Sequence, residues 1–152
     1  MVQQIESTNS KQTEDLGRQI GKRLRGGEVI ELISDLGGGK TTFVHGLADG
    51  VGSKDNVASP TFTINRLYKG NAINVQHFDF YRLSEAGLMA DELAEIIDDP
   101  TNVIVIEWAQ IVHDLLPGAR LTINFINIGE NERRLELTYP EALNYLVKDL
   151  KL

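Results

Sequence analysis

The sequence contains no cysteine. Disulfide bonds, a thiolate nucleophile and cysteine-based zinc sites are therefore all excluded. Histidine is nearly as scarce, and the three histidines, His45, His77 and His113, form no H-x-x-x-H pair, so we do not expect a zinc enzyme. The sequence also lacks a long apolar run and a signal-like segment at Met1. We therefore expect a cytoplasmic protein that uses no membrane.

Positive charge is also in short supply. The formal net charge is −7 at pH 7 and the pI is near 4.9. A protein that holds nucleic acid by itself normally carries a basic face, because neutralising phosphates supplies much of its affinity. The local excess of Arg18, Lys22, Arg23 and Arg25 is typical of a solvated helix face, and a docking patch is the alternative. We expect no direct nucleic-acid binding by the chain alone, and any RNA would be held by a partner.

The residues that are present are sufficient for one ordinary domain. The chain has 152 residues, of which 41% are hydrophobic and 24% are charged. This length can enclose a core of its own, and no linker is long enough to separate domains. We expect residues 1–152 to form a single α/β domain of the P-loop NTPase type, with a mixed central sheet flanked by helices.

The segment S-D-L-G-G-G-K-T-T, residues 34–42, follows an apolar run at 29–33 and precedes a helix-period segment that ends near 50–52. A strand, a glycine-rich turn and a helix form the context in which G-K-[ST] binds phosphate. Glycines let successive backbone N–H groups point at the phosphates, and the helix directs its positive end to the same place. The predicted nucleotide-binding residues here are Gly37, Gly38, Gly39, Lys40, Thr41 and Thr42.

One position of this loop departs from the usual G-x-x-x-x-G-K-[ST] pattern, because Ser34 stands where the first glycine is expected. That position lies where the strand turns into the loop, whereas phosphate contact falls mainly on residues 37–41. We interpret Ser34 as a change in the shape of the loop and not as loss of the site. The alternative is that G-G-G-K is only a flexible turn.

The rest of the chain alternates between apolar patterns and turns. Residues 1–9 are weakly patterned, and Glu31 is an unexplained acid within an apolar strand. The predicted elements are a helix from Asn9 or Ser10 to Gly26-Gly27, an antiparallel hairpin of strands 62–68 and 73–78, a helix at 84–98, a strand buried on both faces at 103–106, a closing hairpin of 121–128 and 134–137, and a helix at 140–150.

Two acids follow predicted strands. Glu107 follows the apolar run 103–106 in the Walker-B form, and Asp79 follows the strand 73–78. In phosphate-loop folds the helper acid lies at the carboxyl end of a neighbouring strand. We predict that Glu107 and Thr41 hold Mg²⁺ and that Asp79 orients water or the hydration shell of the metal, with Lys40 as the third catalytic residue. Alternatively, Asp79 caps the turn after its strand and Glu107 pairs with an arginine. Trp108 is expected to pack beside the site.

Four motifs occur in an order and spacing that resemble one family. They are G-x-L-G-x-G-K-T-T at 34–42 with Ser34 in the first position, S-P-T-F at 59–62, H-F-D-x-Y-R at 77–82 and I-E-W at 106–108. Together they resemble the TsaE (YjeE-type) bacterial ATPases. The resemblance implies a weak ATPase that binds ATP or ADP with Mg²⁺. It also implies a role in threonylcarbamoyl modification of tRNA, with the tRNA reached through a TsaD–TsaB-type transferase whose turnover the ATPase supports.

The resemblance also implies roles for individual residues, and this chain differs from the family at two positions of the loop. It implies that Thr41 and Glu107 are Mg²⁺ ligands, that Arg133 lies near the nucleotide and that Thr8 borders the adenine. Relatives have glycine at position 34 and usually a small residue such as alanine at position 38, where this chain has Ser34 and Gly38. Two other functions are considered: a small-molecule kinase, disfavoured because no arginine-rich lid insertion follows the central strands, and a nucleotide-binding switch without significant catalysis.

Overall fold

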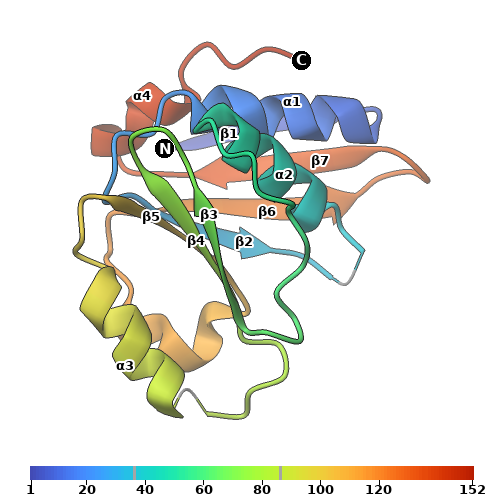
Figure 1. Cartoon of the computed structure of the whole chain (residues 1–152). Coiled ribbons are helices and arrows are strands. Elements are labelled where there is room, and N and C mark those ends of the chain that lie inside the picture. The colour runs from blue at the N-terminus through green and yellow to red at the C-terminus, as the bar shows by residue number, and fades with distance from the viewer. Residues whose placement is uncertain (36, 86) are drawn as a thin grey trace.

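A single mixed sheet organises the computed structural model, which describes residues 1–35, 37–85 and 87–152 (Figure 1). The sheet has seven strands in the order β1-β7-β6-β2-β5-β4-β3. The strands are β1 (Val2–Ser7), β2 (Val29–Ile33), β3 (Asn65–Lys69), β4 (Asn74–Asp79), β5 (Asn102–Glu107), β6 (Leu121–Asn127) and β7 (Arg133–Thr138). This arrangement confirms the predicted α/β fold with a mixed central sheet.

Helices cover both faces of the sheet. The described helices are α1 (Ser10–Gly21), α2 (Lys40–Gly50), α3 (Gly87–Ile96), the 3₁₀ segments η1 (Ala109–Leu115) and η2 (Glu141–Leu143), and α4 (Asn144–Val147). Figure 1 shows α1, α2 and α4 on one face and α3 on the other. Among the helices of the described residues, none has the length and apolar character that crossing a membrane requires.

The centre of the sheet is parallel, and this brings the carboxyl ends of its strands to one edge. β2 pairs in parallel with both β5 and β6, and β4 pairs in parallel with β5. β5 is buried along its whole length, as its continuous β-branched run predicted. β3, β7 and β1 add antiparallel pairs at the two sides, and the two predicted hairpins are confirmed.

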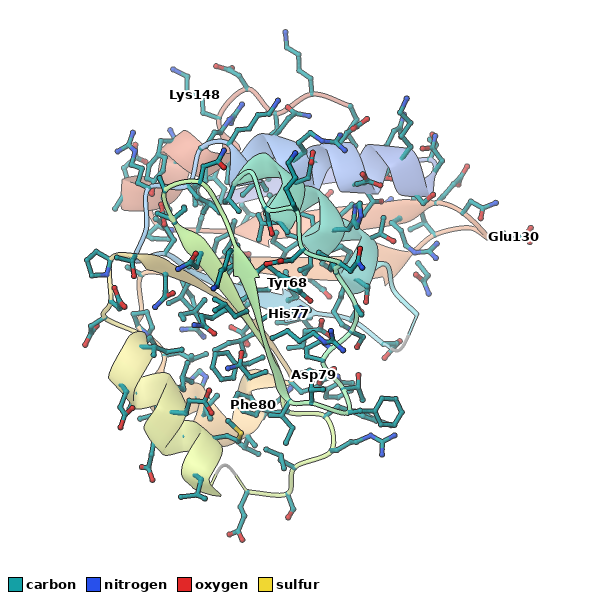
Figure 2. All side chains as sticks on the ribbon, viewed as in Figure 1. Tyr68, His77, Asp79, Phe80, Glu130 and Lys148 are labelled. Atoms are coloured by element: carbon teal, nitrogen blue, oxygen red, sulfur yellow. The ribbon has the colours of Figure 1, made fainter. Side chains whose placement is uncertain are left out.

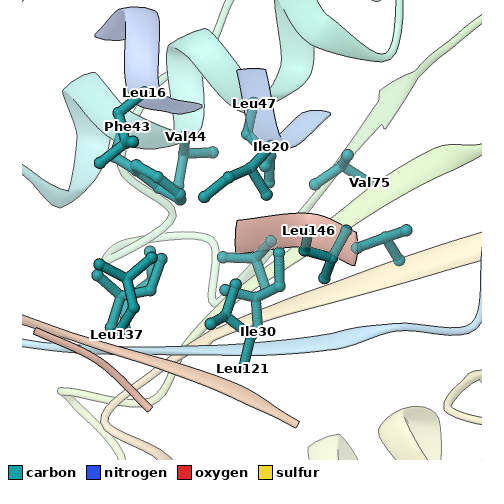
Figure 3. Packing of buried hydrophobic residues seen from close by; sticks show 14 of the residues in the cluster. Leu16, Ile20, Ile30, Phe43, Val44, Leu47, Val75, Leu121, Leu137 and Leu146 are labelled. Atoms are coloured by element: carbon teal, nitrogen blue, oxygen red, sulfur yellow. The ribbon is translucent and has the colours of Figure 1, made fainter. Parts of the chain in front are cut away.

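Side chains of alternate strand residues enter two separate cores. Figure 3 shows the larger core, in which side chains of α1, α2 and α4 meet those of the sheet. On β5 the side chains of Val103 and Val105 belong to this core, whereas Ile104 and Ile106 belong to the second core beneath α3 and η1. The period-two alternation of a strand therefore places Glu107 on the face that α1 and α2 cover.

Glycines allow α1 and α2 to pack with their backbones in contact. A Cβ atom at Gly46 would lie 1.9 Å from the Glu14 carbonyl oxygen, and one at Gly17 would lie 2.2 Å from the carbonyl oxygen of Phe43. The same close approach occurs at Gly21 and Gly50. We call these contacts the glycine seam. The seam fixes α2, whose first residues belong to the phosphate loop, directly against α1.

The prediction for the N-terminal residues was incomplete. Residues 1–9 carry β1, whose six residues pair antiparallel with β7. The helix that follows is capped by Asn9, as predicted, since the Asn9 side chain accepts a hydrogen bond from the Gln12 N–H at 3.0 Å. This helix ends at Gly21 and not at Gly26-Gly27.

Three other boundaries were also wrong. The predicted strand 62–68 begins only at Asn65, because the N–H groups of Thr63 and Ile64 bond back to the Pro60 carbonyl in a turn. The predicted helix 84–98 is described only as Gly87–Ile96. The predicted helix 140–150 is reduced to a 3₁₀ turn and the one-turn α4, because the chain leaves the helical conformation at Lys148.

The unexplained Glu31 has an ion-pair partner. Its carboxylate lies 2.7 Å from Nε of Arg120, at the start of β6, and both side chains are mostly buried. Glu31 points to the face opposite the glycine seam, because its neighbours Ile30 and Leu32 belong to the larger core. The acid is therefore a paired structural charge within β2.

Candidate functional site

The phosphate loop joins β2 to α2, as its sequence predicted. Gly37 and Gly39 have φ angles of 78° and 98°, in the left-handed region that favours glycine. Gly38 is restricted for another reason, because a Cβ atom there would lie 2.4 Å from Oγ of Ser34. Each of the three glycines is thus required by the conformation of the loop, and α2 begins directly after them at Lys40.

A cavity of about 270 Å³ lies between this loop and the carboxyl ends of β4 and β5. Its lining contains all six predicted loop residues, both predicted acids and two residues with hydroxyl groups that were not predicted as site residues. The lining residues are Gly37, Gly38, Gly39, Lys40, Thr41, Thr42, Ser59, Thr61, Asp79 and Glu107. The structure therefore brings together every predicted site residue except Thr8 and Arg133.

The two acids meet because of strand register. Asp79, the last residue of β4, is the direct partner of Glu107, the last residue of β5, in the parallel pairing of these strands. Both carboxylates are only 3% exposed. Figure 2 labels Asp79 at the end of β4, beyond His77 on the same strand. Two buried carboxylates at adjacent strand ends, facing a helix N-terminus, form a site suited to a cation and phosphate.

Glu107 is held by a histidine and a lysine, and not by the arginine of the alternative interpretation. Nε2 of His77 lies 2.8 Å from Oε1 of Glu107, and Nζ of Lys40 lies 3.7 Å from Oε2. The Lys40 ammonium also donates a 2.8 Å hydrogen bond to the Ser34 hydroxyl. In this structure the lysine is therefore turned toward the base of its own loop and toward Glu107.

Asp79 does cap the turn after its strand. Its Oδ1 accepts a hydrogen bond from the Tyr81 N–H at 2.9 Å, and its Oδ2 accepts one from the Thr61 hydroxyl at 2.8 Å. The capping alternative is thus confirmed as a geometric fact. The same contacts attach the S-P-T-F segment to the cavity, and the carboxylate keeps further lone pairs for a water molecule.

A second, smaller cavity of about 170 Å³ lies beside the first, on the side of α1 and the β6–β7 turn. It is lined by Ser10, Thr13, Gly37, Gly39, Thr42, Asn131 and Arg133. Nε of Arg133 donates a 3.2 Å hydrogen bond to the Gly38 carbonyl, which places this side chain against the loop. Arg133 was predicted from the family resemblance. Ser10, Thr13 and Asn131 were not predicted, because single polar residues at a helix start and a turn give no distinctive signal.

Thr8 is the predicted site residue that lies outside both cavities. Its backbone N–H and its hydroxyl both donate to Oε1 of Gln12, at 2.7 and 3.0 Å, and its side chain is exposed. Thr8 lines neither of the two cavities described above. The suggested contact with adenine therefore stays a prediction.

Trp108 packs beside the site. Its backbone adopts a left-handed conformation with φ of 57°, and its ring centroid lies 4.9 Å from that of Tyr81. The guanidinium of Arg82, the residue after Tyr81, lies over the ring of Phe62, 4.2 Å from the centroid. Because Trp108 directly follows Glu107, we expect its fluorescence to respond to Mg-nucleotide bound at that carboxylate.

The oxygen atoms that line the larger cavity are suitable ligands for a Mg²⁺ ion that is bound together with a nucleotide. Mg²⁺ is commonly bound by one or two protein oxygens, with phosphates and water completing the octahedron. Thr41 supplies a hydroxyl and Glu107 and Asp79 supply carboxylates to one cavity. In the described part of the chain no three acidic or histidine residues are arranged to hold a metal by themselves.

Comparison with known proteins gives a consistent result. Residues 7–135 match the family described as Threonylcarbamoyl adenosine biosynthesis protein TsaE. Curated relatives named tRNA threonylcarbamoyladenosine biosynthesis protein TsaE include one from Bacillus subtilis, 34% identical over 87% of this chain and 82% of the relative, and one from Treponema pallidum, 35% identical over 85% and 95%. The crystal structure of Bacillus subtilis YdiB superposes with a TM-score of 0.77 at 30% identity, covering 96% of this chain and 93% of YdiB. The family match spans most of the chain and the fold agrees over almost all of it, so this protein belongs to the TsaE family.

Proposed function

We propose that this protein is a Mg²⁺-dependent ATP-binding and ATP-hydrolysing accessory protein of tRNA threonylcarbamoyladenosine modification. The relatives' names support the pathway. The observation that carries the biochemical part is the register between β4 and β5, which places Asp79 and Glu107 in the same cavity as the phosphate loop. A loop of this kind without strand-end acids would bind phosphate but would lack the groups that hydrolysis requires.

Each group of residues in the cavity has a separate role in this proposal. The N–H groups from Gly37 to Thr42 and the N-terminus of α2 hold the β- and γ-phosphates. Lys40 exchanges its contacts with Ser34 and Glu107 for the phosphates, so that one positive charge moves from the base of the loop to the nucleotide. Thr41 and Glu107 hold Mg²⁺, which supplies charge neutralisation at the phosphate oxygens when bound.

Asp79 positions water in this proposal. Its two oxygens each accept one hydrogen bond from the protein, and the remaining lone pairs face the cavity that it lines. Thr61, in the S-P-T-F segment, holds the Asp79 carboxylate by a hydrogen bond. A movement of that segment would therefore change the orientation of the carboxylate. We propose that the partner, a TsaD–TsaB-type transferase, acts on turnover through such a movement and that tRNA is reached only through the partner. The net charge of −7 supports the indirect contact with tRNA.

Two substitutions test the site. Lys40→Ala removes the mobile charge, and we expect it to abolish binding of ATP and ADP in a calorimetric titration. Glu107→Gln keeps the size of the side chain, and we expect it to retain nucleotide binding while Mg²⁺-dependent phosphate release falls by at least about 100-fold, typical of loss of a metal-anchoring or catalytic group. Normal ATP hydrolysis by Glu107→Gln would refute the metal assignment.

The reaction type is tested separately. Incubation of the purified protein with γ-labelled ATP and a metabolite pool distinguishes an ATPase, which releases labelled phosphate, from a kinase, which labels an acceptor. The same incubation with and without the transferase pair measures whether turnover depends on the partner. Absence of any heat on titrating ATP or ADP into the protein would overturn the proposed function as a whole.

A further inference from the structure

We propose that His77 is a positioning residue that aims the Glu107 carboxylate into the cavity, and this inference rests on the proposed function. His77 lies on β4 two residues before Asp79, so the two side chains share one face of the strand. Its direct partner across the sheet is Val105, two residues before Glu107. The register therefore places the imidazole beneath the acid, and Nε2 lies 2.8 Å from Oε1 of Glu107.

The two oxygens of Glu107 have partners that behave differently. Oε2 faces Lys40 at 3.7 Å, whereas Oε1 faces His77, which is fully buried. In the proposed nucleotide complex Lys40 leaves for the phosphates, and Oε2 becomes free for the metal or its water. His77 cannot follow, because it is fixed within the sheet. One carboxylate oxygen is thus held while the other is presented to the ligand.

A buried carboxylate needs such a donor. Glu107 is only 3% exposed, so solvent cannot replace a lost hydrogen bond, and an unpaired charge there would rotate or draw in other groups. Because the carboxylate only accepts, Nε2 of His77 is the donor of the pair. Hydrogen-bonded partners of metal ligands act in this way in many sites, where they fix the orientation of the ligand.

The second ring nitrogen argues against a purely structural histidine. Nδ1 of His77 is buried and has no hydrogen-bond partner among the described residues. Within the described surroundings, the ring of Tyr68 lies 6.2 Å away at a tilted angle, and the cross-strand neighbours of His77 are Val105 on β5 and Arg66 on β3. No hydrogen bond joins Arg66 to the ring, and the Nε atom of Arg66 is itself without a partner among the described residues. An apolar side chain would fill this place without leaving a polar atom unpaired. The bond to Glu107 is therefore what distinguishes histidine from leucine or phenylalanine at this place, since packing alone would favour an apolar side chain.

The experiment compares a variant that keeps an N–H donor with one that does not. His77→Gln carries an amide N–H at about the reach of the ring Nε2, and His77→Leu fills similar space without a donor. We expect both to bind ADP without Mg²⁺ within about twofold of the unmodified protein, because the phosphate loop is untouched. In a Mg²⁺ titration with ADP, followed by Trp108 fluorescence, the midpoint should rise about 10-fold or more for His77→Leu and about threefold or less for His77→Gln.

Turnover and controls complete the test. At saturating Mg²⁺ we expect a lower kcat for His77→Leu with an unchanged KM for ATP. The same substitution at His113, an exposed residue outside the cavity lining, should change neither quantity. If His77→Leu does not fold, His77→Phe replaces it as the variant without a donor.

The outcomes separate the two proposals. A Mg²⁺ midpoint that is the same in all His77 variants and in the unmodified protein overturns the inference and leaves the proposed function intact. Equal losses in the leucine and glutamine variants, accompanied by equal losses of thermal stability, assign His77 a structural role and also overturn it. Failure of the unmodified protein to bind nucleotide, or to respond to Mg²⁺, overturns the proposed function and the inference together.

Discussion

Replacement of Gly46 by alanine tests the glycine seam between α1 and α2. The new Cβ atom would lie 1.9 Å from the Glu14 carbonyl oxygen, 2.8 Å from its carbonyl carbon and 3.0 Å from the backbone nitrogen of Arg18. All three are backbone atoms of α1, so no side chain can turn aside and the helices must separate. Overpacking of this kind costs about 3 kcal/mol, and the better helix propensity of alanine returns about 1 kcal/mol. The free energy of unfolding should therefore fall by about 2 kcal/mol.

Thermal unfolding measures this change directly. For a chain of this size, 2 kcal/mol corresponds to a decrease in Tm of about 4–8 °C. Gly118→Ala is the control, because a Cβ atom there meets nothing within 4 Å, and we expect its Tm to stay the same or rise slightly. Since α2 begins at Lys40, the Gly46 variant should also bind ADP more weakly. A Gly46→Ala protein as stable as the unmodified one would refute the backbone contact that we describe.

Two further predictions concern the loop and the C-terminal helix. Gly38→Ala places a Cβ atom 2.4 Å from Oγ of Ser34, so it should weaken ADP binding in calorimetry. The double variant Gly38→Ala with Ser34→Gly should recover the affinity for ADP. Equal affinities of the single and the double variant would exclude this contact. Tyr145 donates to the Glu28 carboxylate at 2.6 Å, and burial, together with that carboxylate, raises the pKa of Tyr145. Because the folded state retains this proton more strongly, the stabilisation is present below about pH 10 and is lost as the pH rises further. Tyr145→Phe should therefore lower the Tm at pH 8, and the difference should shrink at more alkaline pH; a constant difference up to pH 11 would contradict the assignment.

The centre of the site could be predicted from the sequence because its signals are local. The glycines and Lys40 stand between an apolar strand and a helix-period segment, and the loop forms where this pattern placed it. Glu107 and Asp79 are each the last residue of a strand that the sequence pattern predicts. Parallel strands bring their carboxyl ends to one edge, so physical reasoning was sufficient to place both acids near the loop.

Features that depend on long-range pairing could not be predicted in the same way. Nothing local reveals that His77 and Glu107 would face each other, because their contact requires the register between β4 and β5. Likewise, β1 is a short polar strand whose partner, β7, lies at the other end of the chain. The seam contact at Gly46 depends on the approach of α1, and glycine within a helix otherwise indicates only a weak helix.

The end of the C-terminal helix was predicted wrongly for a related reason. The apolar spacing near the C-terminus fits a long amphipathic helix, yet α4 stops at Val147. The carbonyl groups of Leu146 and Lys148 accept hydrogen bonds from the Arg23 guanidinium, which comes from the turn after α1. A tertiary partner thus takes the carbonyl groups that a continued helix would have used, and a helical period cannot report this competition.

The glycine seam also determines how movement travels through the molecule. Two helices in backbone contact, with the Arg18–Asp49 ion pair also joining them, have little room to slide, so we expect α1 and α2 to move together. A displacement that phosphate produced at the start of α2 would then reach the far end of α1. In the turn after α1, the Arg23 guanidinium donates hydrogen bonds to the carbonyl groups of Leu146 and Lys148. We therefore expect that a nucleotide at the phosphate loop would affect the position of the last residues of the chain.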